Sequence, residues 1–537
     1  MTSLTIVSFD WAVFVVYIVG VFGFGIYMSR RDKGAQDYYQ AGRQLPWYAI
    51  ALSLFATNIS SGSLVGLAGD GYRVGMAVGT LEWGAVLGLL LLAYVFLPFY
   101  RRSGVYTTPE FLEKRYNLTT RILFGTAILL FEMLIFLPFL LYAGGLVVEV
   151  MFGIPLTTAV IVIAVFVGVY TTYGGLGAVV WTDVLQGIVM LVGGSLIVLL
   201  GLREIGGFGA LFTQAEGHMH VCLPADHPDF PFPGTMIGGF FLISVYFWCQ
   251  NQTIVQRSLG ARSLWDAQMG TVAACFIKLV SPFVIVLPGV IAAVLLPDLE
   301  KSDQALPALI AEVIPAGLRG IIIAAVAASL MSSADSAINS WATIFTFDFY
   351  QRLMNPKASE QQLVRVGRMV TILLLTIAVI RAPMLRENDS ILQYLLNALA
   401  YISVPVVVVF LIGIFWWRAT AIAATITFIG SPFICYMSQY NHQLLRFGSH
   451  PMSMVYWIPI ATVLSSLLFV GISFLSRAPS FESIEGVLWS HEGALGSQLR
   501  GGIGDPGQTA RYTFWTDHRC WAVLSLVLLG LTLWVLR

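Results

Sequence analysis

Long stretches of apolar residues recur along the whole chain, each about the length of a membrane-spanning helix. A helix needs about 20 predominantly apolar residues to cross the hydrocarbon core of a bilayer. About fourteen segments meet that length, and most connections between them are short. They begin near Val7, Trp47, Met76, Thr120, Pro155, Ala178, Pro233, Trp265, Ala316, Leu363, Ile391, Ala419, Ser453 and Arg519. The pattern predicts an all-α polytopic membrane protein, with residues 1–537 forming a single transmembrane domain.

Composition and charge agree with a lipid bilayer as the surroundings of this chain. Hydrophobic residues make up 57% and charged residues 11%, whereas about 25% of a soluble domain is charged. The formal net charge is zero, so we expect no nucleic-acid partner. Lys and Arg favour alternate loops, which usually marks the cytoplasmic side of a cell membrane. This bias predicts both termini outside. The strongest inner anchors are Arg30, Arg31, Lys33, Arg101, Arg102, Lys114, Arg115, Arg352, Arg365 and Arg368.

One apolar segment, from Trp47 to Gly75, is interrupted in its middle by small polar residues and glycine. Residues 56–63 read Ala-Thr-Asn-Ile-Ser-Ser-Gly-Ser, and Gly66, Gly69 and Gly71 follow. We expect the helix to break there. Unwound backbone at mid-membrane depth is tolerated where it lines a protein cavity or coordinates an ion. The segment is therefore a candidate cation and solute site.

A second polar cluster lies in the span that begins near Ala316. Ser329, Ser333, Ser336 and Ser340 are spaced so that they share one stripe of a helix, and Asp335 lies beside it. Such residues can serve close helix packing, with hydroxyls bonded to their own helix. An aspartate is costly inside a membrane, however, which favours a functional role for the cluster. Hydroxyls and free carbonyls form a hard, all-oxygen set of ligands, and sodium is the cation that we expect.

Other chemistry is not indicated. The five cysteines form no CxxC pair, so we expect no disulfide framework and no thiolate metal site. His218, His220 and His227 lie in the 203–232 loop at spacings that match no standard metal-ligand pattern. We interpret that loop as solvated. No arrangement of nucleophile, base and oxyanion donors is apparent, so we do not expect an enzyme.

Several short motifs, in this order along the chain, resemble those of one transporter family. They include Ala41-Gly42-Arg43, residues 53–62, 66–69 and 82–83, Thr108-Pro109-Glu110-Phe111, Tyr173-Gly174-Gly175-Leu176, Trp181-Thr182-Asp183 and residues 251–257, 331–340, 345–350 and 410–416. Over most of its length the chain resembles the sodium/solute symporter family, and particularly its sodium/glucose and sodium/galactose cotransporter branch.

The resemblance implies a LeuT-type architecture with two inverted five-helix repeats. The repeats would be residues 47–203 and 233–416, with an extra first helix at 7–28 and C-terminal helices over 419–537. It also implies a sodium ion held by the carbonyls of Ala56, Ile59 and Ser329 and the hydroxyls of Ser332 and Ser333. A second cation site, or a release path, would use Asp183, Asp335 and Ser336.

For the solute, the resemblance directs attention to Glu82 and Lys278, whose charged groups suit sugar hydroxyls. The alternative is a structural ion pair without ligand contact. Phe247 and Trp248 match an aromatic platform and inner gate, although packing would explain them equally well. Ser63 and Ser244 replace other hydrogen-bonding residues of the branch, and Asn397 adjoins Leu396, which stands at a usual glutamine. These differences leave room for a smaller or differently arranged hydroxylated solute.

Together these features predict a sodium-driven symporter that imports a sugar or polyol, similar to galactose or glucose, by alternating access. Two alternatives stay open from the residues. One is sodium symport of another small solute, such as an amino acid, a carboxylate or a nucleobase. The other is a sodium-linked channel or sensor.

Overall fold

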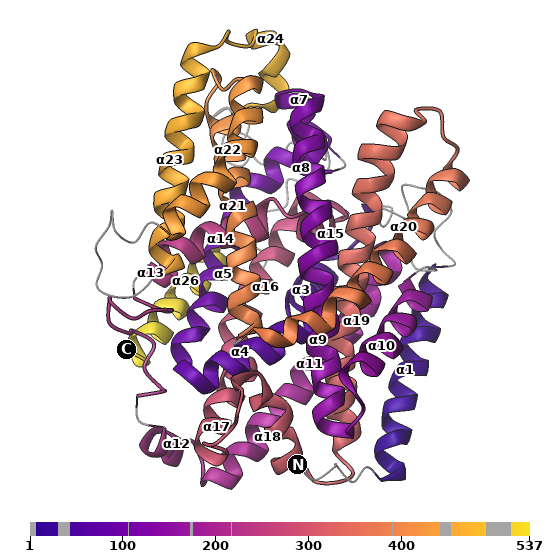
Figure 1. The fold of residues 1–537 in the computed structure, drawn as a ribbon, viewed down its shortest axis with the longest axis vertical. Helices are drawn as coiled ribbons and strands as arrows, with labels where there is room; N and C mark the ends of the chain where they lie inside the picture. Colours follow the sequence, from indigo (N-terminus) through magenta and orange to yellow (C-terminus); the bar gives the residue numbers. More distant parts are fainter. Residues whose placement is uncertain are drawn as a thin grey trace.

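The computed structural model describes residues 7–29, 43–105, 107–171, 176–215, 217–232, 234–388, 390–440, 453–489 and 517–537. These residues are almost entirely helical, and an isolated bridge between Leu45 and Ala261 is the only β-pairing among them. The long helices lie side by side in one elongated bundle (Figure 1). The predicted all-α fold is confirmed.

The first part of the bundle runs from α1 to α12. Its elements are α1 (Ser8–Ser29), α3 (Trp47–Asn58), α4 (Ser61–Val74), η2 (Met76–Gly79), α5 (Thr80–Leu91), η3 (Leu92–Phe96), α6 (Leu97–Ser103), α7 (Thr108–Arg115), α8 (Leu118–Phe131), η4 (Glu132–Phe136), α9 (Leu137–Phe152), α10 (Leu156–Thr171), α11 (Leu176–Ile205) and α12 (Phe208–Gln214).

The second part runs from α13 to the C-terminal helix. Its elements are α13 (Gly234–Ile237), α14 (Gly239–Cys249), α15 (Gln252–Leu259), α16 (Leu264–Ile285), α17 (Leu287–Leu295), η5 (Ser302–Gln304), α18 (Ala305–Val313), α19 (Arg319–Ile344), η6 (Phe345–Met354), α20 (Glu360–Arg381), η7 (Ala382–Glu387), α21 (Ile391–Phe415), α22 (Ala421–Tyr440), α23 (Met454–Leu475), α24 (Phe481–Ile484), η8 (Glu485–Val487) and α26 (His518–Val535).

Within the described residues, eleven helices are long and apolar enough to cross a membrane, and α3 with α4 adds a twelfth, bent span. Two further predicted spans contain shorter apolar helices, at Leu156–Gly168 and Gly234–Cys249. A multi-pass membrane protein is therefore confirmed. The count of fourteen crossings stays a prediction, because these two helices are shorter than a full span.

The break expected between Trp47 and Gly75 falls between Asn58 and Ser61, where the chain bends by 62°. Ile59 leaves helical geometry at φ −86° and ψ 87°. Ser60 then caps the next helix, because its hydroxyl accepts a hydrogen bond from the Ser63 N–H at 2.9 Å. Small polar side chains therefore terminate one helix and start another inside the apolar segment.

A second interruption separates α14 from α15 at Gln250 and Asn251. The Asn251 side chain caps α15 by accepting a hydrogen bond from the Thr253 N–H at 2.9 Å. The two broken helices stand at the start of residues 47–203 and of residues 233–416, and α15 packs against α3. The two interruptions therefore belong to helices that contact each other, and the assignment of these ranges as repeats stays a prediction.

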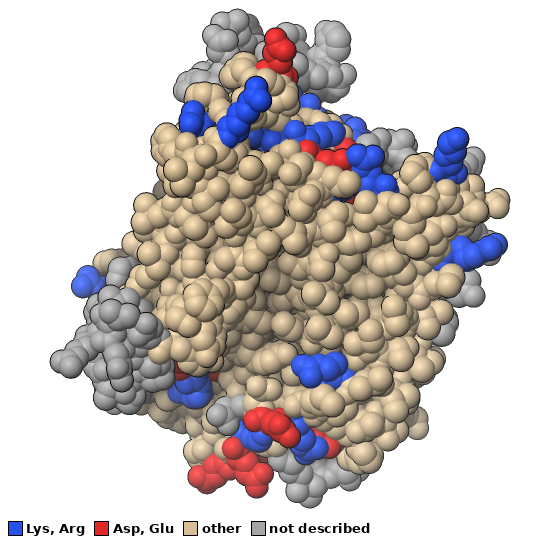
Figure 2. Space-filling view, turned by 45° about the horizontal axis from the view of Figure 1, so that its top comes forward, with Lys and Arg blue, Asp and Glu red and all other residues tan. Residues whose placement is uncertain are grey.

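Charged side chains gather at the two ends of the bundle. In Figure 2 most Lys and Arg side chains lie at the end that carries α7 and α24, and a broad uncharged band separates them from the opposite end. The start of α1 and the end of α26 belong to that opposite part. Asp10 accepts hydrogen bonds from the Gly317 and Gly320 N–H groups at the start of α19, and the Leu536 carbonyl accepts one from the Val221 N–H.

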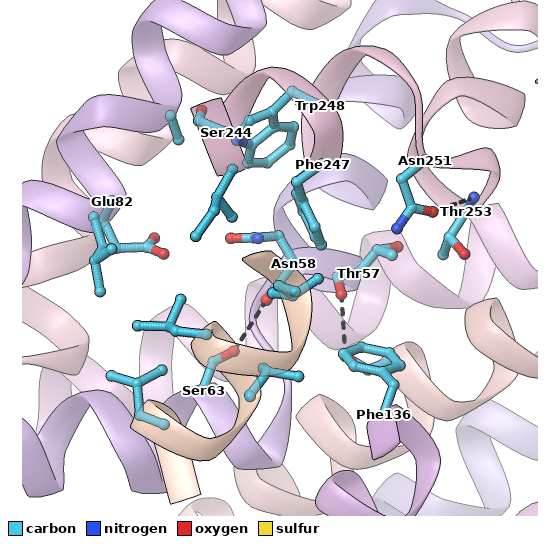
Figure 3. A pocket seen from close by; sticks show the side chains of 18 of the residues that line it. Thr57, Asn58, Ser63, Glu82, Phe136, Ser244, Phe247, Trp248, Asn251 and Thr253 are labelled. Carbon is cyan, nitrogen blue, oxygen red and sulfur yellow. Dashed lines mark hydrogen bonds between the residues drawn. The ribbon is translucent and has the colours of Figure 1, made fainter. Parts of the chain in front are cut away.

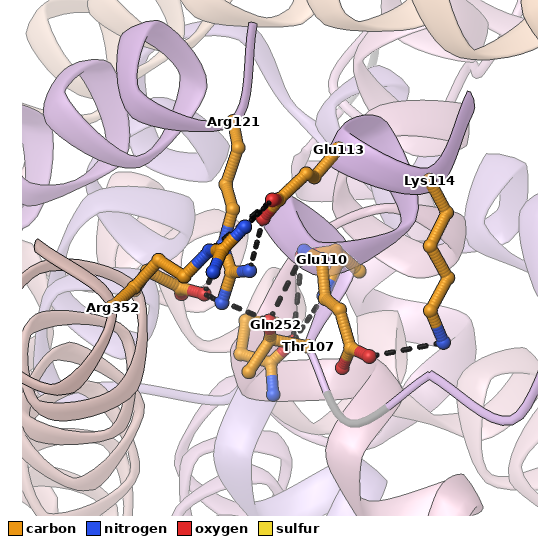
Figure 4. Close-up of polar contacts among 9 residues, drawn as sticks. Thr107, Glu110, Glu113, Lys114, Arg121, Gln252 and Arg352 are labelled. Atoms are coloured by element: carbon orange, nitrogen blue, oxygen red, sulfur yellow. Dashed lines mark hydrogen bonds and ion pairs between the residues drawn. The ribbon is translucent and has the colours of Figure 1, made fainter. Parts of the chain in front are cut away.

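At the basic end, an ion-pair network fastens α7 to its neighbours (Figure 4). Glu113 lies 2.5 Å from both Arg121 and Arg352, and Arg121 also pairs with Asp348 on η6. Burial alone would raise the pKa of Glu113, but the two guanidinium groups hold it below its ordinary value. In addition, the Gln252 side chain accepts a hydrogen bond from the Thr108 N–H at 2.9 Å, which connects α15 to α7.

Candidate functional site

The break in α3 and α4 leaves two backbone carbonyls without their ordinary helical donors. The Ser60 N–H would normally bond to the Ala56 carbonyl, but it donates to Asn58 instead. Likewise the Ser63 N–H, the ordinary partner of the Ile59 carbonyl, donates to the Ser60 hydroxyl. All three of Ala56, Ile59 and Ser60 are buried. Buried carbonyls in this condition are favourable ligands for a cation.

The serine cluster of α19 faces this break. The Ser333 hydroxyl donates to the Thr57 carbonyl at 3.1 Å, and the Ser332 hydroxyl donates to Asp183 on α11 at 2.5 Å. A hydroxyl that donates its proton keeps lone pairs with which its oxygen can bind a cation. Ser329 donates to the Val326 carbonyl of its own helix at 2.8 Å. The structure thus brings the predicted ligands of α3 and α19 to two facing helices.

Asp183, Asp335 and Ser336 are also buried, and an arginine that the sequence analysis left without a role lies among them. Asp183 accepts hydrogen bonds from Ser53 at 2.6 Å and from Arg257 at 3.2 Å. Arg257 also donates to Ser336 and, at 2.8 Å, to Ser53. Asp335 is within electrostatic range of Arg257. The guanidinium therefore already supplies positive charge where a second cation would bind.

A cavity lies beside the break. Polar residues on its wall include Thr57, Asn58, Ser63, Glu82, Glu132, Ser244, Asn251, Thr253 and Ser333. In Figure 3, Ser63 follows the break, Glu82 points in from the facing helix, and Ser244, Phe247 and Trp248 lie along α14. Of the residues predicted to bind solute, these five line the cavity. Ser63 also donates to the Asn58 carbonyl at 3.3 Å.

Glu82 and Lys278 form a buried ion pair with an oxygen–nitrogen distance of 2.5 Å. Ser281 donates a further hydrogen bond to Glu82 at 2.8 Å, and Lys278 donates to the Asn58 side chain. The ammonium group also lies 5.4 Å from the centre of the Trp248 ring. The pair thus connects α5 and α16 to the residue at which α3 ends. Lys278 itself is behind the wall and reaches the cavity through its two partners.

Asn397, also predicted to bind the solute, does not line the cavity. Its amide donates to the Gln393 carbonyl at 2.9 Å and accepts from Gln439 of α22 at 3.3 Å. The cavity wall is formed instead by Leu396 and Leu399 of the same helix. Adjacent positions on a helix point about 100° apart, so the neighbouring residue turns toward α22.

Comparison with known proteins places this bundle in a family. The model of the sodium:solute symporter family matches residues 38–431. The chain belongs to that family. Among its relatives, the sodium/glucose cotransporter of Vibrio parahaemolyticus is 37% identical over 460 residues, which cover 80% of this chain and 84% of that protein. The sodium/myo-inositol cotransporter 2 of Sus scrofa is 34% identical over 451 residues, covering 76% and 66%.

Solved structures agree with the fold of this symporter. A substrate-bound, outward-open Na⁺-coupled sialic acid symporter superposes with a TM-score of 0.78 at 24% identity, covering 88% of this chain and 99% of that one. Mhp1, a nucleobase-cation-symport-1 family transporter, gives a TM-score of 0.53 at 15% identity, covering 84% and 97%. The LeuT-type fold is therefore confirmed. The chain is a sodium-coupled membrane transporter and not an enzyme.

Proposed function

We propose that this symporter imports a sugar or polyol by alternating access around the cavity beside the α3–α4 break. The observation that carries the proposal is that the break contacts both the predicted sodium ligands and the predicted solute-binding residues. The Thr57 carbonyl accepts from Ser333, and the next residue, Asn58, accepts from Lys278. Relatives named as glucose and myo-inositol cotransporters support a hydroxylated solute.

We assign the sodium ion to the carbonyls of Ala56, Ile59 and Ser329 and to the hydroxyls of Ser332 and Ser333. The diverted helical donors at the break support this assignment, since they leave oxygen atoms that a cation can satisfy. The five ligands carry no formal charge. Such a site binds a monovalent cation without the tight hold of a carboxylate cage, so that release into the cell stays feasible.

Coupling between ion and solute follows from the position of Asn58. A cation bound between α3 and α19 would restrain residues 56–59, and therefore the Asn58 side chain that contacts Lys278. Lys278 in turn positions Glu82, the carboxylate on the cavity wall. Sodium binding would thus organise the solute site before the solute arrives, which lowers the ordering cost of solute binding.

For Asp183, Asp335 and Ser336 we propose a release path in preference to a second cation site. Arg257 provides a charge opposite to that of Asp183, so a further cation there would meet electrostatic repulsion. Ser332 contacts both regions, because its hydroxyl donates to Asp183 while its oxygen remains available to sodium. Sodium leaving the cage would therefore pass Asp183 next.

For the solute we propose contacts with Glu82, Ser63 and Ser244, and an apolar platform formed by Phe247 and Trp248. Carboxylate and hydroxyl groups pair well with sugar hydroxyls, and aromatic faces pack against the apolar face of a sugar ring. The direction of the Asn397 side chain argues against a direct role for that residue. The repeats are assigned to residues 47–203 and 233–416, flanked by 7–28 and 419–537.

We place the end with α7 and α24 in the cytoplasm, because the basic residues concentrate there. Both termini would then lie outside the cell. The hydrogen bonds of Asp10 and of the Leu536 carbonyl to segments of the opposite end support this orientation. A cysteine introduced at Arg537, with the five native cysteines replaced, would check it, because a membrane-impermeant thiol reagent should label it in intact cells as fully as in permeabilised cells.

The experiment that tests the function is uptake of labelled galactose, glucose and myo-inositol into proteoliposomes, with and without an inward sodium gradient. Wild type should accumulate at least one of them only with sodium. Ser333→Ala should raise the sodium concentration needed for half-maximal uptake by about tenfold, which corresponds to about 1.4 kcal/mol. Ser466→Ala is the matched control, since Ser466 only donates to the Thr462 carbonyl of α23. No uptake of any of the three would contradict the proposed solute class.

A further inference from the structure

Glu132 is a second carboxylate on the cavity wall, and the sequence analysis gave it no role. It is the first residue of η4, a short π-helical segment between α8 and α9. Pro138, near the start of α9, cannot donate a helical hydrogen bond, and a local π-turn accommodates such a defect. Segments of this kind occur often at functional sites. Here the segment turns an acidic residue toward the cavity.

The carboxyl group of Glu132 is buried, and no cationic side chain in the described part of the chain pairs with it. The residue is 3% exposed, and its Oε2 atom has no hydrogen-bond partner among the described residues. Other buried acids of the bundle differ in this respect. Glu82 pairs with Lys278, Asp183 with Arg257 and Asp348 with Arg121. A buried carboxyl group without a neighbouring cation favours its neutral, protonated form, and a positively charged group beside it would stabilise the ionised form and be bound favourably by it.

The cavity wall itself offers no such group. Neither Lys nor Arg belongs to the described residues that line it, and the Lys278 ammonium is committed to Glu82 and Asn58. Tyr246, which also has a buried and unpartnered hydroxyl, is within electrostatic range of Glu132 but carries no positive charge. A cation that pairs with Glu132 would therefore have to come from outside the protein, through the cavity.

Aromatic rings complete these surroundings. Phe131 and Phe136 flank Glu132 in sequence, line the same cavity and stack with their centres 6.2 Å apart. Phe247 and Trp248 form another part of the wall, in an edge-to-face arrangement at 5.3 Å. Aromatic faces together with a carboxylate form a typical environment for an ammonium group. A neutral hydroxyl would form a hydrogen bond with the carboxyl group but would not stabilise its ionised form.

We propose that Glu132 binds a cationic amino group of the solute, so that the symporter prefers an amino sugar or amino polyol to its neutral counterpart. The inference rests on the proposed function, since it concerns the same cavity. Glu82 and the serine hydroxyls would receive the hydroxyl groups of such a solute. Glu132 would then determine selectivity at its own part of the wall, where an ammonium group would stabilise the ionised carboxylate.

The test compares sodium-driven uptake of labelled D-glucosamine, D-glucose and N-acetyl-D-glucosamine into proteoliposomes, at a pH at which the glucosamine amine is protonated. The acetylated sugar has the nitrogen without its charge. Wild type should transport glucosamine about tenfold better than glucose and should disfavour the acetylated sugar. Glu132→Gln, which keeps the shape of the side chain, should lose that preference, and Glu132→Asp should retain part of it.

Glu149→Gln is the matched control, because Glu149 lies on the adjoining α9 and pairs with Arg386 away from the cavity wall. It should keep the wild-type ratio of glucosamine to glucose. Thermal unfolding of each purified variant separates misfolding from altered selectivity. Sodium-driven glucose uptake with no preference for the amine, or an equal preference in Glu132→Gln, would overturn the inference and leave the proposed function intact. No sodium-driven uptake of any of these sugars, of galactose or of myo-inositol would overturn both.

Discussion

The pair formed by Glu82 and Lys278 permits a sharp prediction, because structure and transport should respond differently to its removal. Lys278 has two acceptors, Glu82 and Asn58, and Glu82 has two donors, Lys278 and Ser281. The Lys278 side chain is 1% exposed and that of Glu82 is 10% exposed. Lys278→Met leaves the Glu82 carboxylate with one hydroxyl, and Glu82→Gln leaves the ammonium with two neutral amides.

The magnitude follows from burial. Removing one member of a buried ion pair costs about 3–5 kcal/mol, because the remaining charge is left in an apolar interior. Replacing both members by neutral side chains of similar volume is often nearly neutral. We therefore expect either single variant to unfold at a clearly lower temperature than wild type. The double variant, Glu82→Gln with Lys278→Met, should recover most of that loss.

Uptake should not recover. Glu82 is on the cavity wall, so the double variant still lacks the carboxylate that we assign to the solute hydroxyls. Thermal unfolding in detergent without solute, together with sodium-driven uptake into proteoliposomes, measures both properties on the same preparation. A double variant with wild-type uptake would refute the reasoning and would show that the pair is purely structural.

Three further predictions concern single positions. Burial and the negative charge of the nearby Asp70 raise the pKa of Asp303 to about 7. In the unfolded chain the pKa of an aspartate is about 4. Because the folded value is higher, the free energy of unfolding of wild type should fall by up to about 4 kcal/mol as pH rises from about 4 to about 7. Asp303→Asn should flatten that slope in thermal unfolding, and an unchanged slope would contradict the assignment. Asn397→Ala should change the KM for the solute less than twofold, since the amide faces Gln439; a tenfold increase in uptake assays would return Asn397 to the solute site. Gly289→Ala should abolish folding or lower the unfolding temperature strongly, because its Cβ would lie 1.8 Å from the Ala68 carbonyl oxygen, whereas Gly471→Ala, with nothing within 4 Å, should behave as wild type.

The sequence predicted the features that depend on local pattern. The small polar run at 56–63 contains both the group that ends α3 and the cap that starts α4, so the break could be located within a few residues. The serine stripe of α19 likewise follows from helical periodicity, and its contact with the break at Thr57 agrees with one common site. The lengths of two spans were predicted less accurately, because α10 and α14 are shorter than the apolar segments that contain them.

Features that depend on helix packing could not be predicted from local sequence pattern. Arg257 pairs with Asp183 across 74 positions of sequence, and only the packing of α15 against the bundle brings them together. The rotation of α21 about its own axis places Leu396 on the side of the cavity and Asn397 on the side of α22. Glu132 did have a signal, since an acid within an apolar span is a functional hypothesis by default. Its lack of a partner, however, could be recognised only in three dimensions.

The most direct test of the central claim is whether a sodium gradient alone drives the solute uphill. Proteoliposomes loaded with labelled galactose at the outside concentration should, on imposition of an inward sodium gradient, accumulate it above that concentration and lose the excess when a sodium ionophore is added. The account predicts this rise and collapse. Equilibration to equal concentrations on both sides, regardless of the sodium gradient, would contradict symport and indicate a channel or a passive carrier.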